Sequence, residues 1–533
     1  MKFLVASFVS LSLALATPAL AQDPAAESRI RADVTFLADD ALEGRQTGQR
    51  GYDLAALYVQ SRMEAIGLKP GGIEGSWRQP ITFARIGIAS EGATLTWTPQ
   101  GGQPVVWTSG QDALFGTGRE AGRVSTTGEL VFVGYGQEAD YAGLDVTGKV
   151  VVILSGAPAG VTGEAAQRID AAKAGLAEAH GAIGTVTVNT EASAQRYNDA
   201  LLRRFANRTE TTWVGPDGKA RNRNPGIRAT AFLTDTAAAA LFAGAPKSYA
   251  EIRAEAAQAG AMPAGFALAG SATFDVHTRR EDIQSSNVIG LIEGTDPVLK
   301  SEYVILTAHL DHIGISGTGD DRINNGAMDN AGGTAAMLEA ARALAANPPR
   351  RSVLVVALTA EEMGLLGSDY LARFPVVADV AANVNLDMPI LTYAFTDVVA
   401  FGAEHSSLGP LVDAAARSEG VVLAEDPMPE QNIFVRSDHY SFVQAGVPAV
   451  MLATGYANGG EAAWGAFFAN GYHQVGDDLD QPFNWTAAAH FARVNEAIAR
   501  AIADADQRPL WYEGNPYGER YAPGAARAPV PAQ

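Results

Sequence analysis

The chain has 533 residues, 47% hydrophobic and 18% charged, which excludes an intrinsically disordered protein and predicts more than one domain. Its 39 Lys and Arg against 59 Asp and Glu give a net charge of −20, so neither nucleic acid nor an anionic membrane is an expected partner. It contains no cysteine, which excludes disulfides, a cysteine nucleophile and cysteine metal ligands.

The first residues have the pattern of an export signal. Lys2 is followed by an apolar stretch over residues 3–16 and by a small-x-small sequence that ends at Ala21. A membrane anchor would need about 20 apolar residues, more than this stretch offers. We therefore expect residues 1–21 to be a cleaved signal peptide. The mature protein is expected to be secreted or periplasmic, without membrane insertion and without a lipid-attachment cysteine.

Residues 22–120 are predicted to form an N-terminal segment that packs against the domain at residues 283–507. Apolar residues recur at helix-like intervals over residues 28–68, with one interruption, and Gly67 ends the pattern. Residues 73–120 are rich in Thr, Trp, Val and Gly, which favours strands and turns.

Residues 121–282 are predicted to form a separate, β-rich α+β module. Its expected strands lie at residues 129–136, 148–154 and 182–188, and an Ala-rich helix is expected at 171–180. The polar stretch 196–228 is interpreted as a surface excursion. His180 and His277 are isolated from other ligand-type residues, so we interpret both as structural histidines.

Residues 283–507 have the pattern of an α/β domain. Apolar runs alternate with helical segments, which indicates a mostly parallel sheet covered by helices on both faces. The expected strands are 287–292, 303–308, 353–359, 382–386, 398–401 and 447–452, and the expected helices are 330–346, 364–373, 408–419 and 486–503. Residues 508–533 form a Pro/Gly/Ala-rich tail, in which Trp511 and Tyr512 are expected to pack against the body and the last ten residues to be disordered.

Ligand-type side chains follow three of these strands. His309 follows the strand at 303–308, Glu361 and Glu362 follow the strand at 353–359, and Asp387 follows the strand at 382–386. The carboxyl ends of strands in an open α/β sheet line one crevice, so these side chains are expected to converge. Histidines and carboxylates bind divalent cations, and a spare carboxylate beside them can take a proton from the attacking water.

His309 is predicted to be a metal ligand, with Asp311 as the carboxylate that orients its ring, because residues two apart in an extended chain point to the same side. Asp329 stands at the entry to a helix, where an N-cap is the alternative role. Asn330 could cap the helix instead, which would leave the Asp329 carboxylate free to bridge two cations.

Glu361 and Glu362 could simply be acids in the first turn of a helix. However, the crowding of these carboxylates with Asp311, Asp329 and Asp387 favours a cation among them. Adjacent side chains cannot face one metal in the same way, so one is expected to coordinate and the other to act as the base.

His473 is predicted to supply a second imidazole. The chain offers other histidines for this place: His312, His405, His439 and His490. A serine nucleophile is excluded, because the consecutive residues Ser437, Asp438 and His439 cannot form a triad and no Gly-x-Ser-x-Gly elbow occurs. The chain also has no glycine-rich phosphate loop of standard spacing.

With these residues identified, the sequence resembles metallopeptidase family twenty-eight, the double-zinc aminopeptidase-like exopeptidases. The matching motifs are Ser286-Asn-Val-Ile-Gly, Ala308-His-Leu-Asp-His, Met328-Asp-Asn-Ala-Gly-Gly, Ala360-Glu-Glu-Met-Gly-Leu-Leu-Gly-Ser, Asn385-Leu-Asp-Met, Ser437-Asp-His-Tyr-Ser-Phe and Tyr472-His-Gln. The resemblance implies a mostly parallel, helix-covered α/β sheet of the zinc-exopeptidase type. It also implies that residues 121–282 are an inserted β-rich α+β protease-associated domain.

The resemblance further implies two Zn²⁺ per chain, with Co²⁺ or Mn²⁺ as possible substitutes. One zinc would take His309 and Asp387, the other Glu362 and His473, with Asp329 and a hydroxide bridging them and Glu361 as the base. Some relatives place a carbonyl-polarising tyrosine where this chain has Phe434 and Val435. Tyr472 would take over that role, as in carboxypeptidase-like relatives.

The expected function is an exported aminopeptidase that hydrolyses N-terminal residues of peptides through a hydroxide activated by the two metals. One alternative is a carboxypeptidase or dipeptidase on the same scaffold, in which Arg436 would pair with a substrate carboxylate. Another is a receptor-like binding protein without catalysis, although such proteins usually lose metal ligands. The sequence predicts no particular oligomeric state.

Overall fold

A computed structural model describes residues 23–531, apart from residues 207 and 317–318. The predicted signal peptide, residues 1–21, lies outside the described residues. Within them, none of the helices is both long and apolar enough to cross a membrane.

The N-terminal segment is helical with an interruption, as predicted. Helices α1 (Pro24–Leu37) and α2 (Arg50–Ile66) flank a short 3-10 helix, η1 (Asp40–Arg45). Asp23 caps α1 by accepting a hydrogen bond from the Ala26 amide, and α2 ends at Gly67, whose φ of 95° is left-handed. Both helices lie against α8 (Gly333–Ala346), and α1 also contacts α13 (Trp485–Asp504).

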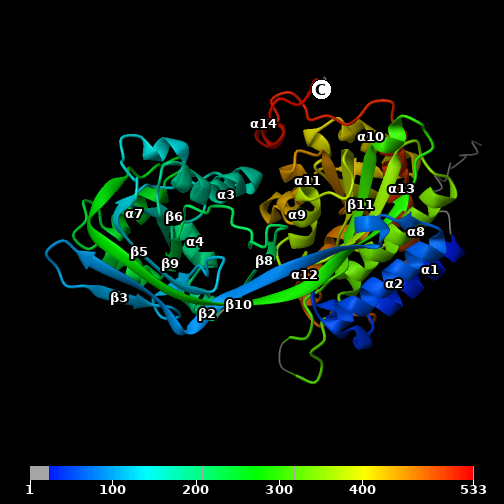
Figure 1. The fold of residues 1–533 in the computed structure, drawn as a ribbon. Coiled ribbons are helices and arrows are strands. Elements are labelled where there is room, and N and C mark those ends of the chain that lie inside the picture. Colours follow the sequence, from blue (N-terminus) through cyan, green and yellow to red (C-terminus); the bar gives the residue numbers. More distant parts are fainter. Residues whose placement is uncertain (1–22, 207, 317–318, 532–533) are drawn as a thin grey trace, which may run out of the picture.

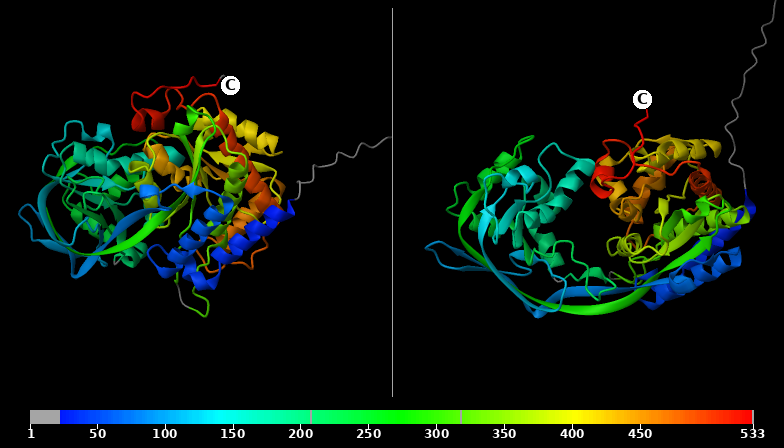
Figure 2. Two further views of the ribbon diagram at one scale, coloured as in Figure 1. Left: turned by 45° about the vertical axis from the view of Figure 1, so that its right-hand side comes forward. Right: turned by 45° about the horizontal axis from the view of Figure 1, so that its top comes forward.

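Two long strands run along both parts of the molecule (Figure 1, Figure 2). They are β2 (Arg78–Pro99) and β10 (Phe266–Ile292), which pair antiparallel with one register shift. Near its start β10 pairs with β5 (Gly122–Phe132), and near its end it pairs with β12 (Ser352–Leu358) and the short β1 (Lys69–Pro70). The predicted domain boundary between residues 282 and 283 therefore falls inside a continuous strand.

Residues between these two strands form a unit with its own hydrophobic core, called the second module below. Its strands β5, β6 (Val150–Leu154), β7 (Gly184–Val188) and β9 (Ala229–Leu233) pair in parallel, and β4 (Ala113–Phe115) joins antiparallel. Strands β3 (Val105–Thr108) and β8 (Glu210–Val214) pair with β2. The helices are α3 (Gly163–Ala179), α4 (Glu191–Arg196), α5 (Asp199–Phe205), α6 (Asp235–Leu241) and α7 (Tyr249–Ala256). The stretch 196–228, interpreted from sequence as a surface excursion, thus contains α5 and β8.

The C-terminal half is the α/β domain expected from its apolar runs. Strand order is β15-β14-β16-β13-β11-β12-β10, with parallel pairing of β11 (Tyr303–His309) to both β12 and β13 (Val380–Leu386), and of β13 to β16 (Ala449–Thr454). Strand β14 (Asp397–Phe401) pairs antiparallel with β16 and parallel with β15 (Val422–Ala424). The mostly parallel α/β fold is therefore confirmed.

Helices cover this sheet on both faces. Helices α1, α2, α8, α10 (Leu408–Ser418) and α13 contact one another, while α9 (Leu366–Arg373) packs with α11 (His439–Gln444). Helix α12 (Gly460–Asn470) precedes the predicted ligand His473.

The tail is ordered further than expected. Trp511 is buried as predicted, and α14 (Pro516–Tyr521) follows it. The expected disorder of the last ten residues is wrong over the part that is described, because the Ala528 amide donates to the Trp511 carbonyl at 2.9 Å and the Ala528 carbonyl accepts from the Glu513 amide at 2.9 Å. The tail also reaches the second module, where Tyr517 donates to the Glu164 carboxylate of α3 at 2.7 Å.

Candidate metal centre

The predicted ligands meet at the carboxyl ends of three neighbouring parallel strands. His309 is the last residue of β11, Glu361 and Glu362 lie in the turn after β12, and Asp387 directly follows β13. Because β12 and β13 both pair in parallel with β11, their ends open onto the same edge of the sheet. The convergence expected from sequence is therefore confirmed.

Asp329 lies between two histidine–carboxylate pairs. Its Oδ1 is 3.2 Å from Nε2 of His309, which is 3.0 Å from Oδ1 of Asp387. Its Oδ2 is 3.5 Å from Nε2 of His473, which is 3.0 Å from Oε2 of Glu362. One carboxylate thus faces both pairs, one with each oxygen. His309, Asp329 and Glu362 are almost completely buried, whereas the His473 side chain is 39% exposed and forms the open side.

A second histidine, His312, also reaches this cluster. Its Nδ1 lies 2.8 Å from Oε1 of Glu362, and its buried Nε2 has no hydrogen-bond partner among the described residues. Ligand atoms of His312, Asp329 and Glu362 lie within 4.8 Å of one another, as do those of His309, Asp329 and Asp387. Sequence reasoning considered His312 only as a substitute for His473, but the structure brings both rings to Glu362. The signal for this was the His-x-x-His spacing from His309.

Asp311 acts differently from the prediction. Nδ1 of His309 is 3.1 Å from the backbone carbonyl of Asp311, so this carbonyl, not the carboxylate, orients the ring and leaves Nε2 facing the cluster. The Asp311 carboxylate instead accepts from the amides of Glu361 at 3.1 Å and Glu362 at 3.3 Å. Burial raises the pKa of Asp311 to about 6. Its physical role is to hold both glutamates in place.

The backbone around Asp329 is held by a more distant acid. Asp329 lies in a wide turn, η5 (Ala327–Gly332), whose Met328 and Asp329 amides donate to the Asp477 carboxylate at 2.7 and 2.9 Å. Asn330, not Asp329, serves the start of α8, because its Oδ1 accepts from the Gly333 amide. Gly326 has a φ of 61°, and a Cβ there would meet the Asp329 carbonyl at 2.3 Å, so the turn requires glycine.

Asp387 is fixed by residues to which sequence reasoning gave no role. The hydroxyl of Ser437 donates to its Oδ2 at 2.5 Å, and the Asn385 amide donates to Ser437 at 2.8 Å. Both residues lie in motifs recognised in the sequence, but nothing in the spacing showed the contact. Ser437 thus bonds to Asp387, and both ring nitrogens of His439 are buried without a partner among the described residues. Ser437 and His439 therefore do not form the hydrogen bond that a serine triad needs.

Backbone strain accompanies the cluster. Ala360 (φ 57°), Met388 (φ 49°) and His473 (φ 55°) are non-glycine residues in the left-handed region, and each is a predicted ligand or flanks a predicted functional residue. Such conformations cost roughly 1–3 kcal/mol each and persist where the surroundings impose them.

The buried charges of the cluster shift the pKa values of histidines and glutamates within it. Burial lowers the pKa of His309, but the charges of Asp387 and Glu361 outweigh it and hold that pKa well above its usual value. Burial also lowers the pKa of His473, but its hydrogen bonds with Asp329 and Glu362 outweigh burial and raise this pKa to about 10. Burial, with Asp387 and Glu362 nearby, keeps the pKa of Glu361 well above normal. Buried carboxylates gathered around histidine rings fit divalent cations, and the mixed imidazole–carboxylate donors suit zinc.

A cavity of about 410 Å³ opens beside the cluster. Its polar wall contains Glu361, Tyr472 and Arg436, and a guanidinium N–H of Arg436 donates to the Tyr472 oxygen at 3.1 Å. Its apolar wall is formed by Ile433, Val435, Met451, Trp464 and Phe468. Phe434 does not line the cavity, whereas Tyr472 does.

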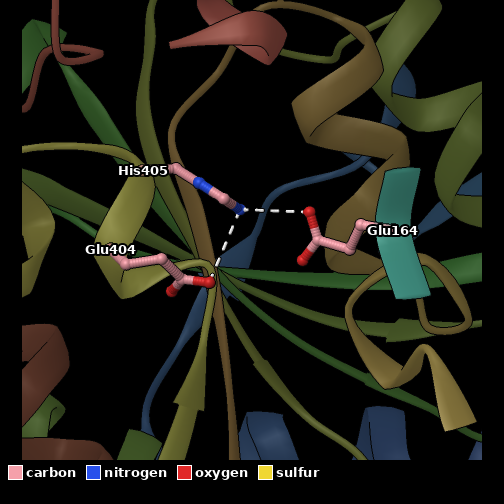
Figure 3. A group of neighbouring side chains, drawn as sticks. All are labelled: Glu164, Glu404 and His405. Atoms are coloured by element: carbon pink, nitrogen blue, oxygen red, sulfur yellow. Dashed lines mark ion pairs between the residues drawn. The ribbon is translucent and has the colours of Figure 1, made fainter. Parts of the chain in front are cut away.

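A further acid–histidine group lies where the second module meets the tail: Glu164, Glu404 and His405 (Figure 3). Nε2 of His405 is 3.8 Å from Glu164 and 3.5 Å from Glu404. Asn515 uses its Oδ1 to cap α14, so its Nδ2 must donate to Nδ1 of His405, 3.2 Å away. The neutral ring therefore carries its proton on Nε2. A metal-ligating histidine normally donates through its other nitrogen, so this group does not fit a metal.

Together, the parallel sheet and the acid–histidine cluster at its carboxyl edge define a metallopeptidase domain. Residues 287–499, which include every predicted ligand, match the model of Peptidase family M28.

The chain is also similar to individual proteins. The chain is 37% identical over 108 residues to Aminopeptidase YwaD of Bacillus subtilis (strain 168), covering 20% of this chain and 22% of the relative. It is 27% identical over 261 residues to a Probable zinc metalloprotease of Pyrenophora tritici-repentis (strain Pt-1C-BFP), covering 42% and 53%. The matches thus span about half or less of these relatives. A solved Aminopeptidase from Aneurinibacillus sp. strain AM-1 aligns with 89% of this chain and 92% of its own at 21% identity and a TM-score of 0.49.

Proposed function

We propose that this protein is an exported, zinc-dependent aminopeptidase that removes N-terminal residues from peptides. The observation that carries the proposal is the Asp329 carboxylate, which faces the His309–Asp387 pair with one oxygen and the His473–Glu362 pair with the other. The match of residues 287–499 to a peptidase family and the aminopeptidase and zinc metalloprotease names of the relatives support it.

The chain's residues would hold two zinc ions. His309 and Asp387 would bind one ion, His473 and Glu362 the other, and Asp329 both, with His312 beside Glu362 helping to position it. Cobalt or manganese would fit the same donors. When bound, such ions polarise a peptide carbonyl and lower the pKa of a coordinated water.

Glu361 would be the base. It lines the cavity, and its backbone amide donates to the Asp311 carboxylate at 3.1 Å. It would take the proton of the attacking water and deliver it to the leaving amine. Tyr472 would stabilise the developing oxyanion. Because Arg436 donates to its oxygen, the hydroxyl proton is free to point into the cavity.

The apolar wall of the cavity, with Met451, Trp464 and Phe468, would accept the side chain of the N-terminal residue. We therefore infer a preference for large apolar residues such as leucine over charged ones, since a charged side chain would lose its hydration against this wall.

A carboxypeptidase or dipeptidase is the second candidate, and one observation favours it. Arg436 is exposed, lines the catalytic cavity and is held beside Tyr472, where it would meet a substrate carboxylate. In that case Arg436→Ala would abolish cleavage of peptides with free C-termini. Peptides with an amidated C-terminus would be cleaved neither by the variant nor by the wild type.

The deciding experiment compares free and N-acetylated short peptides with the wild type and with Glu361→Gln, alongside metal analysis. Aminopeptidase activity predicts cleavage from the free amino end, about two metal ions per chain, and loss of turnover in Glu361→Gln. Cleavage of acetylated peptides from the other end would establish the second candidate. Metal without turnover would indicate a binding protein, and N-terminal sequencing of exported protein would test cleavage before Gln22.

A further inference from the structure

An arginine-lined cavity lies next to the catalytic one, between the second module, the peptidase domain and the tail. Its volume is about 660 Å³, and five arginines line it: Arg168, Arg221, Arg223, Arg373 and Arg520. None of the described residues that line it is an aspartate or a glutamate, although the chain as a whole carries a net charge of −20. In Figure 1, α3 faces α9 and α11 across this region, with α14 close by.

The arginines come from four separate elements. Arg168 is on α3, Arg373 ends α9, and Arg520 is on α14, while Arg221 and Arg223 follow β8. Elements far apart in sequence thus present the same charge to one space. Like charges repel, so this arrangement costs free energy unless an anion offsets it.

The charges are only partly neutralised by the protein. The buried Asp369 carboxylate pairs with both Arg221 and Arg373, the latter at 3.0 Å, and also accepts from Trp213 at 2.6 Å. Arg168 lies 3.6 Å from Glu164. Across the described ranges, no carboxylate lies within 4.0 Å of Arg223 or Arg520, and both side chains are exposed.

The two cavities adjoin. Val435 lines both, and its neighbour Arg436 lines the catalytic one. A peptide whose first residue lies at the metal cluster would therefore meet the arginine-lined cavity with its later residues. Guanidinium groups recognise carboxylates with paired hydrogen bonds, so this cavity suits carboxylates better than any other peptide group.

We propose that the arginine-lined cavity is a subsite that binds carboxylates of the peptide downstream of the cleaved bond and makes acidic peptides preferred substrates. The position of the bound peptide rests on the proposed peptidase function. The binding of carboxylates to the cavity does not depend on it. The carboxylates would come from aspartate and glutamate side chains or from the C-terminus of a short peptide.

The test uses leucine-led hexapeptides that differ only in two central residues, which are glutamate, glutamine or lysine, each with a free or an amidated C-terminus. For the wild type we expect kcat/KM to be highest with glutamate and lowest with lysine. In Arg223→Gln/Arg520→Gln the ratio for glutamate over glutamine should fall about tenfold, mainly through KM. The matched control is Arg279→Gln, an exposed arginine of β10 outside both cavities, which should keep the wild-type ratio.

The C-terminus distinguishes the two sources of carboxylate. A preference that persists in amidated peptides identifies side-chain carboxylates, and one that vanishes on amidation identifies the terminal carboxylate. Either preference should weaken between roughly 0.01 M and 1 M salt. Equal ratios in the wild type and the double variant would overturn the inference while leaving the proposed function intact.

Binding without turnover separates the two proposals. Fluorescence anisotropy with a labelled glutamate hexapeptide is measured on Glu361→Gln, with and without the two arginine substitutions. Binding that is at least about fivefold weaker in the arginine variant supports the subsite even if no peptide is cleaved. An affinity that changes neither with the charge of the peptide nor with the two arginine substitutions overturns the proposed subsite.

Discussion

At the scale of single residues, the candidate centre depends on side chains that hold the predicted ligands rather than on the ligands alone. Asp311 positions Glu361 and Glu362 through their amides, and Ser437 positions Asp387. Asp477 does the same for the turn that carries Asp329. Residues of this kind set the direction from which each donor approaches, so their replacement should affect metal affinity before it affects the fold.

Asp477→Asn tests this directly. Burial raises the pKa of Asp477 to about 6, and its two oxygens accept from the Met328 and Asp329 amides. An asparagine side chain would place its N–H group opposite one of these donating amides, so one hydrogen bond to the Asp329-bearing turn would be lost. We expect metal affinity, measured by chelator competition, to fall about 10- to 100-fold, with kcat/KM following.

Asp480→Asn is the control, because Asp480 lies in the same loop, is exposed and does not contact the turn. Wild-type metal affinity in both variants would contradict the role assigned to Asp477.

His439 makes stability depend on pH. Burial lowers the pKa of this histidine from 6.5 to about 3, so it stays neutral in the folded chain. The unfolded chain binds the proton at higher pH, and stability is therefore complete above pH 6.5 and is lost as the pH falls towards 3. The loss reaches about 1.4 kcal/mol per pH unit.

The check is the urea midpoint of unfolding across this pH range in the wild type and in His439→Leu. The variant should show the shallower pH dependence, whatever its stability at neutral pH. Parallel curves would show that His439 does not contribute to acid sensitivity.

At the scale of elements, the N-terminal segment belongs to the centre and does not merely cover it. The guanidinium of Arg45, at the end of η1, donates to the carbonyls of Leu310 at 2.9 Å and Gly326 at 3.0 Å, and also to those of Leu37 and Asn325. Leu310 follows His309, and Gly326 begins the turn that bears Asp329. One buried side chain thus joins α1 to both ligand-bearing loops.

Arg45→Met would leave these carbonyls without their donor. Arg45 is 1% exposed, and unsatisfied buried groups cost about 1–3 kcal/mol each, so the free energy of unfolding should fall by at least about 3 kcal/mol. Activity on a neutral peptide should fall with it. Thermal unfolding measures the first effect. Arg50→Met, at an arginine that is 70% exposed in α2, should change neither quantity.

At the scale of the whole molecule, β2 and β10 join the second module to the peptidase domain, and side-chain contacts also connect the two parts. Asp369 of α9 pairs with Arg221, which follows β8, and accepts from Trp213 of β8 at 2.6 Å. The contact also forms one wall of the arginine-lined cavity. A buried charged contact therefore holds the second module against the peptidase domain beside the arginine-lined cavity.

Asp369→Asn should release this contact. Removal of one partner from a buried ion pair costs about 3–5 kcal/mol, and here two guanidinium groups would lose their carboxylate. We expect faster proteolysis within residues 215–228 and a lower unfolding temperature. Asp413→Asn, which removes an exposed pair with Arg417, should leave the cleavage rate unchanged. An unchanged rate in Asp369→Asn would show that the long strands alone hold the module.

Much of the fold and of the centre followed from local pattern. Apolar runs at residues 303–308, 353–359 and 382–386 became β11, β12 and β13 with bounds shifted by a few residues, because buried parallel strands need continuous apolar sequence. His309, Glu362 and Asp387 converge because their strands are parallel neighbours. The pattern predicted the parallel sheet, and the structure showed which strands are neighbours. The helix predicted from residue 330 begins at Gly333 instead, because the turn that carries Asp329 comes first.

The sequence by itself thus determined which residues gather at the sheet edge, whereas tertiary structure decided how each is held. The Asp311 carboxylate turns to two amides, His312 reaches Glu362, and Ser437 reaches Asp387. The arginine-lined cavity likewise arises from four elements that no spacing relates. The position of each strand follows from the apolar runs along the chain. The direction of a side chain and the meeting of distant charges depend instead on how the elements pack, for which the linear sequence carries no local signal.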